Sequence, residues 1–320
     1  MKKVVIAGGG VLGSQIAFQA AYCGFDVTIW LRSQGSIGRT QPKIDNLRKS
    51  YIDAIGLMDS PQGEANWCRG IADAGSFEPA KCLEQVEKAY SGIKLELDMA
   101  AAAADADIII ESVAENVKDK IAFYQALAPL MPEKTLLCTN SSTLLPSNFA
   151  KYTGRPEKYL SLHFANSIWK NNTAEVMAQD KTSKDAFDAV IAFANDIRMV
   201  ALPVNKEKNG YLLNSMLVPF LFSGLDLYVN GVSDPASIDK AWKYGTGAPR
   251  GPFEIFDVVG ITTARNIALQ YQKVPGLFTP ILRKMMMPYN FKGMLQLFDK
   301  MIAEGKLGRS TGEGFYKYSK

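Results

Sequence analysis

Histidine is almost absent from this sequence, and cysteine is scarce. The 320 residues include one histidine, His163, and four cysteines, namely Cys23, Cys68, Cys82 and Cys138. No two cysteines form a Cys-x-x-Cys pair and the histidine does not cluster with them, so we expect no metal site. This usage favours reduced, buried thiols in a cytosolic protein.

Long apolar stretches and basic runs are also missing. The sequence has no apolar segment of about 18 residues, the length that a transmembrane helix needs, and no run of five basic residues. The 36 Lys and Arg exceed the 32 Asp and Glu by only four charges, which does not indicate nucleic-acid binding. Residues 1–3 lead directly into a strand-like run, without a signal-peptide pattern. We therefore expect a cytoplasmic protein with neither nucleic-acid nor membrane partners.

Short apolar runs alternate with helical patterns through the first two thirds of the chain. We predict strands at 4–7, 26–31, 107–112, 135–140, 159–165, 175–178 and 199–204, and helices at 12–23, 118–131 and 183–197. Residues 33–92 are polar, rich in helical patterns and interrupted by Gly and Pro, which predicts a helical excursion at the sheet edge. The alternation is typical of the α/β class, with a Rossmann-type, mostly parallel sheet.

The last third of the chain has a different character. Residues 209–320 show helical periodicity and no convincing strand, and residues 212–225 carry a long apolar stripe. We therefore predict two domains: a dinucleotide-binding domain over 1–204 and an all-α domain over 205–320.

A Gly-x-Gly-x-x-Gly motif joins the first predicted strand to the first predicted helix. Gly8 permits the tight turn, Gly10 lets a pyrophosphate approach the backbone, and Gly13 lets the helix pack against the strand. The start of the helix then offers free N–H groups to the phosphates. In this context the motif indicates a dinucleotide site that includes Val11 and Leu12, and a purely structural turn is the alternative.

The acidic residue that usually follows the second strand of an NAD site is missing. This position reads Trp30, Leu31, Arg32, Ser33. An acid would bind the ribose 2′-hydroxyl, whereas Arg32 would suit a 2′-phosphate. Arg32 as a solvated strand end is equally compatible with the sequence. The predicted cofactor is NAD, and NADP is also possible.

His163 lies near the end of an apolar strand, and a single histidine is more often a core residue than a catalyst. Its position argues for a role, because the strand is expected to end at the ligand-binding edge of the sheet. Glu175 follows twelve residues later. If the intervening loop is a hairpin, the two side chains meet. A buried carboxylate would then fix the imidazole tautomer and favour the imidazolium, as a general base for an alcohol requires.

Several motifs occur in the order found in the 3-hydroxyacyl-CoA dehydrogenases, and the chain resembles that family over nearly its whole length. The motifs are Asn140 to Leu144 (NSSTL), His163 to Ser167 (HFANS), Ala174 to Val176 (AEV), Asn214 within GYLLNSMLVPFL, Gly251 to Asp257 (GPFEIFD) and Gly312 to Tyr316 (GEGFY). The resemblance implies a homodimer formed through the helical domain.

The resemblance also implies roles for individual residues. His163, paired with Glu175, would be the general base, and Ser142 and Asn214 would hold and polarise the substrate oxygen. The implied cofactor contacts include Glu115, Lys120 and Asn140. For Ser142, Asn214 and Lys120, purely structural or solvated positions are the alternatives.

Some positions depart from the family pattern. Ser167 stands where the family has proline, within a loop that would border the substrate, and residues 33–92 are longer than is typical. Lys43, Arg48 and Lys49 are candidates for CoA phosphates, although a solvated helix face explains them better.

We therefore expect an enzyme of fatty acid metabolism that interconverts 3-hydroxyacyl-CoA and 3-ketoacyl-CoA with a nicotinamide cofactor. The first alternative is a related dehydrogenase for a non-CoA hydroxy acid, of the sugar acid or carnitine type. The second is a dinucleotide-binding protein without turnover.

Overall fold

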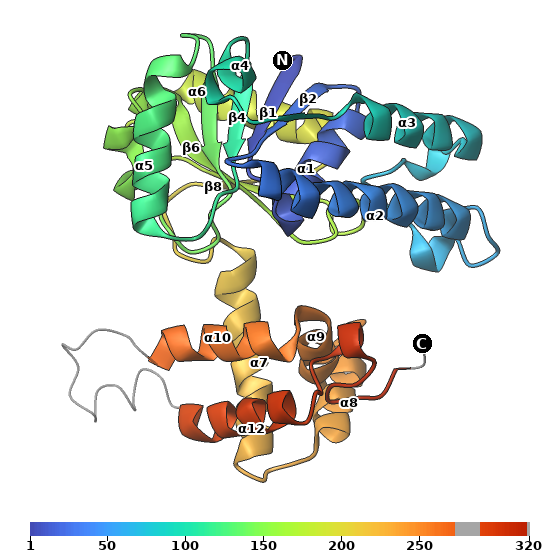
Figure 1. Ribbon diagram of the computed structural model, residues 1–320. Coiled ribbons are helices and arrows are strands. Elements are labelled where there is room, and N and C mark those ends of the chain that lie inside the picture. The colour runs from blue at the N-terminus through green and yellow to red at the C-terminus, as the bar shows by residue number, and fades with distance from the viewer. Residues whose placement is uncertain (273–288, 319–320) are drawn as a thin grey trace. The chain divides into compact units, whose positions relative to one another are not determined.

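A computed structural model describes residues 1–272 and 289–318 and divides the chain into two compact units, Met1–Leu212 and Leu213–Lys320. The first unit contains the sheet and the second is helical (Figure 1). The expected class, a Rossmann-type α/β domain followed by an all-α domain, is confirmed.

One eight-stranded sheet forms the centre of the first unit, in the order β3-β2-β1-β4-β5-β6-β7-β8. The strands are β1 (Lys3–Ala7), β2 (Asp26–Trp30), β3 (Lys94–Glu96), β4 (Ile108–Glu111), β5 (Leu136–Thr139), β6 (Tyr159–Phe164), β7 (Thr173–Met177) and β8 (Val200–Val204). β1 to β6 are mutually parallel, whereas β7 is antiparallel to β6 and parallel to β8. The central strands are buried because β-branched and other apolar residues fill both of their faces.

Helices cover both faces of this sheet. On one face α1 (Val11–Tyr22), α2 (Gln34–Met58), α3 (Pro79–Gly92) and α6 (Lys184–Asp196) share a core with Val4, Ile6 and other strand residues. On the opposite face α4 (Met99–Ala103) and α5 (Val117–Leu127) pack over Val5 and Ala7. Alternate residues of β1 therefore anchor the two layers, as the two-residue period of a strand requires.

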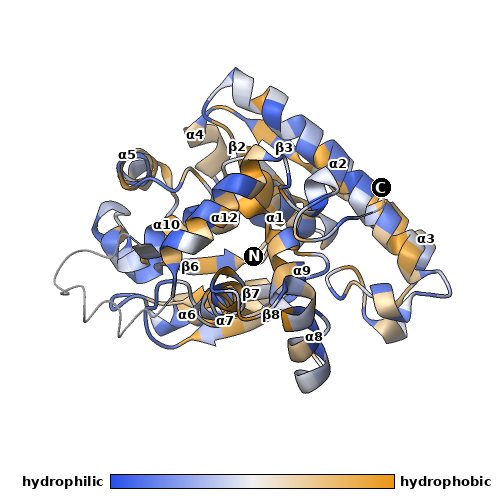
Figure 2. Ribbon diagram, turned by 90° about the horizontal axis from the view of Figure 1, so that it is seen from below, coloured by the Kyte–Doolittle hydropathy of each residue, from blue (hydrophilic) through white to orange (hydrophobic). Residues whose placement is uncertain are grey.

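Two long helices account for most of residues 33–92. α2 and α3 pack beside α1, and Arg48 of α2 forms an ion pair of 2.7 Å with Glu87 of α3. Hydrophilic and hydrophobic residues alternate along both helices (Figure 2), which fits one buried and one solvated side. The short strand β3 follows this excursion and was not expected from the sequence.

Helix α5 ends earlier than expected, at Leu127 instead of residue 131. Pro129 follows in a short 3-10 helix, Ala128–Leu130. Proline has no backbone N–H and cannot extend the α-helical hydrogen-bond ladder, which explains the early end.

The second unit has its own apolar core, built from α7 (Leu213–Val229), α8 (Pro235–Thr246), α9 (Pro252–Val259), α10 (Ile261–Gln272) and α12 (Phe291–Ala303). Two of the family-like motifs meet here. The Asp257 carboxylate accepts hydrogen bonds from the backbone N–H groups of Phe315 and Tyr316 and from the Tyr318 hydroxyl. The motifs at 251–257 and 312–316 therefore stabilise this unit by joining α9 to the C-terminal segment.

The boundary between the units lies at 212/213, eight residues beyond the expected position at 204. Residues 205–212 belong to the first unit because Tyr211 packs with Met177 and Val204, and the Leu212 N–H donates to Glu175.

Among the residues that the structure describes, no helix combines the length and apolar character needed to cross a membrane.

Candidate active site

The glycine turn after β1 has the geometry of a phosphate cradle. Gly8 has a left-handed φ of +118°, and a Cβ there would lie 2.6 Å from the carbonyl oxygen of Ser112. A Cβ at Gly13 would lie 2.1 Å from the Gly8 oxygen, whereas one at Gly10 meets no atom within 4 Å. The turn is therefore packed on the protein side and open at Gly10.

The start of α1 is well suited to an anion. Gly10 is its N-cap without a side-chain hydrogen bond, and the first turn contains no acidic residue. The first N–H groups of a helix have no intrahelical partner, and the helix dipole makes this end positive. Val11 is 63% exposed and Leu12 is partly buried. These features fit the pyrophosphate of a dinucleotide cofactor.

At the end of β2 the structure presents basic and hydroxyl groups. Leu31 is buried, whereas Arg32 is exposed. Beyond it, the hydroxyls of Ser33 and Ser36 are 3.0 Å apart, and Arg39 donates to the Ser36 hydroxyl. This surface carries positive charge where an NAD site usually carries an acid.

His163 and Glu175 form a buried pair on neighbouring strands. They face each other in the antiparallel register of β6 and β7, and the distance between His163 Nδ1 and Glu175 Oε2 is 2.9 Å. Their residues are only 6% and 3% exposed. The second carboxylate oxygen accepts a hydrogen bond from the Leu212 N–H at 2.8 Å. The expected hairpin contact is thus present, and the carboxylate fixes one imidazole nitrogen.

Ser142 contacts the other nitrogen of the same imidazole. Its Oγ lies 3.1 Å from His163 Nε2, in the loop after β5. Tyr211 covers one face of the imidazole, with ring centroids 4.4 Å apart and planes inclined by 9°. Of the four residues expected to act on the substrate, the structure thus brings three together. Asn214 lies in the first turn of α7, in the second unit, and its role stays a prediction.

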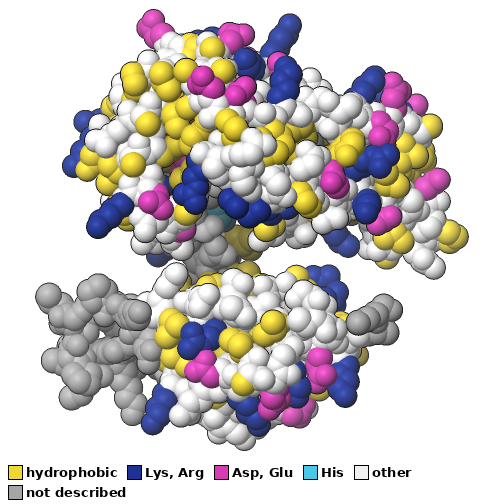
Figure 3. All heavy atoms as spheres, viewed as in Figure 1, with side chains coloured by type: hydrophobic (Ala, Val, Ile, Leu, Met, Phe, Trp, Pro, Cys, Tyr) yellow, Lys and Arg dark blue, Asp and Glu magenta, His cyan; other side chains and the backbone are white. Residues whose placement is uncertain are grey.

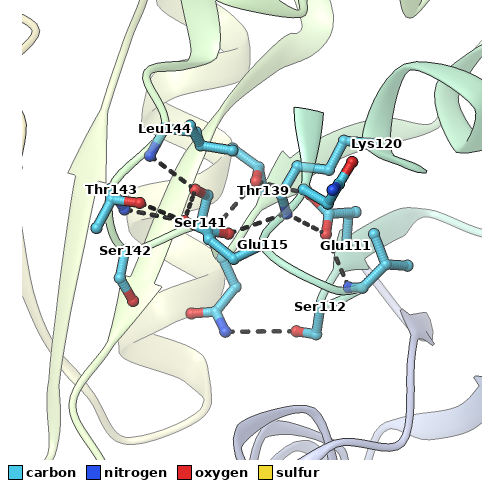
Figure 4. A network of polar contacts seen from close by, with 12 residues as sticks. Glu111, Ser112, Glu115, Lys120, Thr139, Ser141, Ser142, Thr143 and Leu144 are labelled. Carbon is cyan, nitrogen blue, oxygen red and sulfur yellow. Dashed lines mark hydrogen bonds and ion pairs between the residues drawn. The ribbon is translucent and has the colours of Figure 1, made fainter. Parts of the chain in front are cut away.

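A second polar network lies next to this loop, centred on a buried ion pair (Figure 4). Lys120 Nζ is 2.6 Å from Glu111 Oε1, and these side chains are 1% and 0% exposed. The other oxygen of Glu111 accepts hydrogen bonds from the hydroxyls of Tyr124 and Thr139. Lys120 was expected to contact the cofactor. The structure shows instead a buried ammonium held by protein carboxylates, and a direct cofactor contact stays a prediction.

Glu115 connects this network to the Ser142 loop. It lies 3.4 Å from the Lys120 ammonium and accepts hydrogen bonds from Ser141 Oγ and from both the N–H and the hydroxyl of Thr143. Burial alone would raise the pKa of Glu115. These hydrogen bonds and the ammonium outweigh burial and hold its pKa below the usual range. Glu115 therefore fixes the residues on both sides of Ser142.

Asn140 links the ends of three strands. Its Oδ1 accepts the Phe164 N–H at 3.2 Å and its Nδ2 contacts Ser112 Oγ at 3.4 Å. Asn140 thus lies between the glycine turn region and the strand that carries His163, where the family resemblance implies a cofactor contact.

The sequence pattern did not predict the roles of Glu111 and Tyr211 in these networks. Glu111 ends an apolar strand and belongs to none of the family-like motifs. The one indication in the sequence is a carboxylate at the end of a buried strand. Tyr211 stands two residues after Asn209 in a family-like segment, but nothing in its identity indicates stacking on a histidine.

Within the described ranges, no group of three His, Cys, Asp or Glu is arranged to hold a metal ion, and the four cysteines are free thiols.

Comparison with known proteins identifies the family of the chain. Residues 3–208 match the family model described as 3-hydroxyacyl-CoA dehydrogenase, NAD binding domain, and residues 210–318 match its C-terminal domain. The chain is 29% identical to the mitochondrial hydroxyacyl-coenzyme A dehydrogenase of Rattus norvegicus over 99% of this chain and 91% of that protein. It is also 29% identical to the 3-hydroxybutyryl-CoA dehydrogenase of Clostridioides difficile over 99% and 100% of the two chains.

A solved diketoreductase, described as acting on dicarbonyl compounds, is 41% identical, with a TM-score of 0.81 and 99% coverage of both chains. Two family models together span nearly the whole sequence, and full-length relatives are oxidoreductases by name. The chain therefore belongs to the 3-hydroxyacyl-CoA dehydrogenase family and is a nicotinamide-dependent oxidoreductase.

Proposed function

We propose that the protein interconverts a 3-hydroxyacyl compound and the matching 3-ketoacyl compound, with His163 as general base and acid. The observation that carries this proposal is the imidazole held between two partners, Glu175 at Nδ1 and Ser142 at Nε2. Such an arrangement leaves one nitrogen to exchange a proton while the other is fixed by a carboxylate.

The chemistry of the dyad follows from these contacts. With Nδ1 donating to Glu175, Nε2 carries a lone pair and accepts the proton of the substrate hydroxyl. A bound nicotinamide would supply the acceptor for the hydride on the carbon that carries this hydroxyl. The Glu175 carboxylate then stabilises the imidazolium, and in the reverse direction Nε2 returns the proton to the substrate oxygen. Ser142 Oγ adjoins the same nitrogen and is suited to orient that oxygen. The family resemblance assigns Asn214 to this oxygen as well.

The first candidate substrate is a 3-hydroxyacyl-CoA. Relatives that are named hydroxyacyl- or hydroxybutyryl-CoA dehydrogenases align with 99% of the chain, which supports this choice. A CoA thioester supplies the acyl group next to the secondary alcohol that the dyad acts on.

A dicarbonyl compound without CoA is the second candidate. The 41% identity to the diketoreductase exceeds the 29% identity to the CoA enzymes. In addition, Arg48 is paired with Glu87, and the Lys43 ammonium donates to the Arg39 carbonyl. Both cations are bonded to other groups of the protein. These contacts weaken the support for a CoA phosphate site on α2.

For the cofactor we propose NAD, with NADP accepted as well. The exposed Arg32, followed by the Ser33 and Ser36 hydroxyls, supports binding of a 2′-phosphate. The open turn at Gly10 and the N-terminus of α1 suit the pyrophosphate that both cofactors share.

We further propose a homodimer formed through the helical unit, and a cytoplasmic location. Val232, Trp242, Tyr244 and Val258 of that unit are between 40% and 84% exposed, and exposed apolar groups of this size favour a protein interface. Among the described residues on the face seen in Figure 3, Lys and Arg side chains are interspersed with Asp and Glu, which does not favour nucleic acid as a partner.

A substrate panel tests the function directly. Acetoacetyl-CoA, free acetoacetate and a 3,5-diketo ester are each reduced with NADH and with NADPH, while absorbance of the reduced cofactor is followed. Turnover only with the thioester supports the first candidate, and turnover only without CoA supports the second. Cofactor binding without turnover on any of them would contradict the proposal.

The His163→Ala variant tests the dyad in the same assay. We expect kcat to fall by about 10²–10⁴-fold, the usual contribution of a general base, while NADH binding stays unchanged. Turnover close to that of the unmodified protein would remove His163 from the mechanism.

A further inference from the structure

Tyr211 contacts the proposed proton-transfer group without being part of the dyad. Its ring lies parallel to the His163 imidazole, with centroids 4.4 Å apart and an interplanar angle of 9°. Glu175 and Ser142 hold the two ring nitrogens in the imidazole plane. A ring stacked on the face restrains the remaining movement, which is tilting out of that plane.

The tyrosine is itself held in place by its hydroxyl. Tyr211 OH donates to the Ser141 carbonyl oxygen at 2.6 Å. Ser141 precedes Ser142, so the same side chain also fixes the loop that brings Ser142 Oγ to Nε2. Burial raises the pKa of the Tyr211 hydroxyl well above its ordinary value, so the group is a neutral donor at physiological pH.

The backbone at this position is unusual for a bulky residue. Tyr211 has a φ of +51° and directly follows Gly210, whose φ is +82°. A left-handed conformation is unfavourable for an aromatic residue and persists where surrounding contacts compensate for it. Here the compensating contacts are the stack, the Ser141 hydrogen bond and the neighbouring Leu212 N–H bond to Glu175.

An aromatic face also interacts favourably with a cation. The face of a tyrosine ring carries negative electrostatic potential and attracts a positive group within about 6 Å. The imidazole becomes positive only when it has taken the substrate proton. The stack is therefore stronger in the charged state, which lowers the energy of proton transfer in addition to fixing the ring.

We propose that Tyr211 is a positioning residue for catalysis, which aligns His163 for proton transfer and supports its charged form through ring stacking, while its hydroxyl orders the Ser142 loop. This inference rests on the proposed function, because it assumes that His163 exchanges the proton.

The test compares two substitutions at Tyr211 with a matched tyrosine elsewhere in the same unit. Tyr211→Leu removes the ring, and Tyr211→Phe keeps the ring but removes the hydroxyl. Tyr22 is the control, because it is equally buried, its ring contacts the Tyr51 ring at a tilt of 54°, and its hydroxyl donates to the Ile71 carbonyl. It gives Tyr22→Leu. Each variant is assayed for kcat and KM on whichever substrate the panel identifies, and NADH binding is titrated by fluorescence to count the folded sites.

We expect Tyr211→Leu to lower kcat per cofactor-binding site by about tenfold, the range of a lost stacking or cation–π contact. KM and the Kd of NADH should remain unchanged. Tyr211→Phe should recover most of this loss, and Tyr22→Leu should keep the kcat of the unmodified protein even where it lowers the yield of folded protein.

An unchanged kcat in Tyr211→Leu would overturn the inference, as would an equal loss in Tyr22→Leu. The His163→Ala variant separates this failure from that of the proposed function. If His163→Ala keeps full turnover, the dyad itself is wrong. If His163→Ala loses turnover while Tyr211→Leu keeps it, only the role of Tyr211 is wrong.

Discussion

His163 and Glu175 are directly opposite partners in the antiparallel pairing of β6 and β7, with Nδ1 and Oε2 2.9 Å apart. Opposite residues of such a pair have Cβ atoms about 4.5–5.5 Å apart. The sheet register therefore holds the two side chains within hydrogen-bonding distance.

Replacing the carboxylate without changing its size tests this pairing. We expect Glu175→Gln to lower kcat by about 10²–10⁴-fold, because an amide neither stabilises an imidazolium nor enforces the same tautomer. Cofactor binding should not change. The control is Glu87→Gln, at an exposed carboxylate paired with Arg48. Full turnover in Glu175→Gln would show that His163 acts without its partner.

Arg32 provides a test of cofactor choice. If it contacts a 2′-phosphate, Arg32→Ala should raise KM for NADPH by about tenfold or more, the worth of a charge-assisted hydrogen bond, and should leave KM for NADH unchanged. Arg48→Ala is the control, since that guanidinium is bonded to Glu87. Equal changes for the two cofactors would show that Arg32 is only a solvated strand end.

The buried ion pair between Lys120 and Glu111 predicts a large stability effect. Lys120→Met leaves the fully buried Glu111 carboxylate without its cation, and breaking a buried pair costs about 3–5 kcal/mol. Urea unfolding followed by tryptophan fluorescence measures the loss. Lys88→Met, which breaks an exposed pair with Glu84, should unfold like the original protein. A similarly small effect for Lys120→Met would mean that the pair contributes little.

Asp107 predicts a dependence of stability on pH. Hydrogen bonding to Lys134, opposed by partial burial and assisted by the Lys2 and Lys3 N–H groups, holds its pKa well below the usual range. Because the folded pKa is lowered, the stabilisation is present above the unfolded pKa of about 3.9 and is lost as pH falls through the folded value.

Asp107→Asn should therefore lower the free energy of unfolding at pH 7 by about 1–2 kcal/mol and should have a smaller effect near pH 3. The control is Asp105→Asn, which removes a more exposed carboxylate from the same lysine. An effect that is independent of pH would contradict the proposed link.

The oligomeric state is open to direct measurement. We expect light scattering at micromolar concentration to give about twice the chain mass of 35.1 kDa, as the family resemblance implies. Tyr244→Asp, at a position that is 84% exposed, should shift the equilibrium toward the monomer if this surface takes part. A monomer in the unmodified protein would contradict the dimer.

The sequence was sufficient to predict most of the sheet, because buried parallel strands such as 108–111 and 136–139 are short apolar runs between polar segments. It did not reveal β3, whose three residues Lys94–Glu96 are too few for any period to be recognised. The glycine turn and the pair of His163 and Glu175 were also predictable, since their spacing follows from local geometry.

Other parts of the site depend on tertiary contacts that no local pattern encodes. Lys120 has the pattern of an ordinary helix residue, and its contact with Glu111 at the end of β4 becomes visible only in the structure. The sequence pattern assigns Tyr211 to the helical domain. In the structure its hydroxyl and its ring both contact residues of the sheet domain. The same contacts explain why the compact units meet at 212/213, whereas the sequence pattern predicts a division at 204/205.

The reversed direction of β7 has a consequence for engineering. Backbone pairing between β6 and β7 sets the distance between the His163 imidazole and the Glu175 carboxylate. The connection at 165–172 does not determine this distance. This connection is fastened separately, through the Gln15 side chain to the N–H groups of Ser167 and Ile168. We therefore expect substitutions at exposed residues of this connection, such as Asn166 and Lys170, to alter which molecules are accepted while the acid–base pair is preserved.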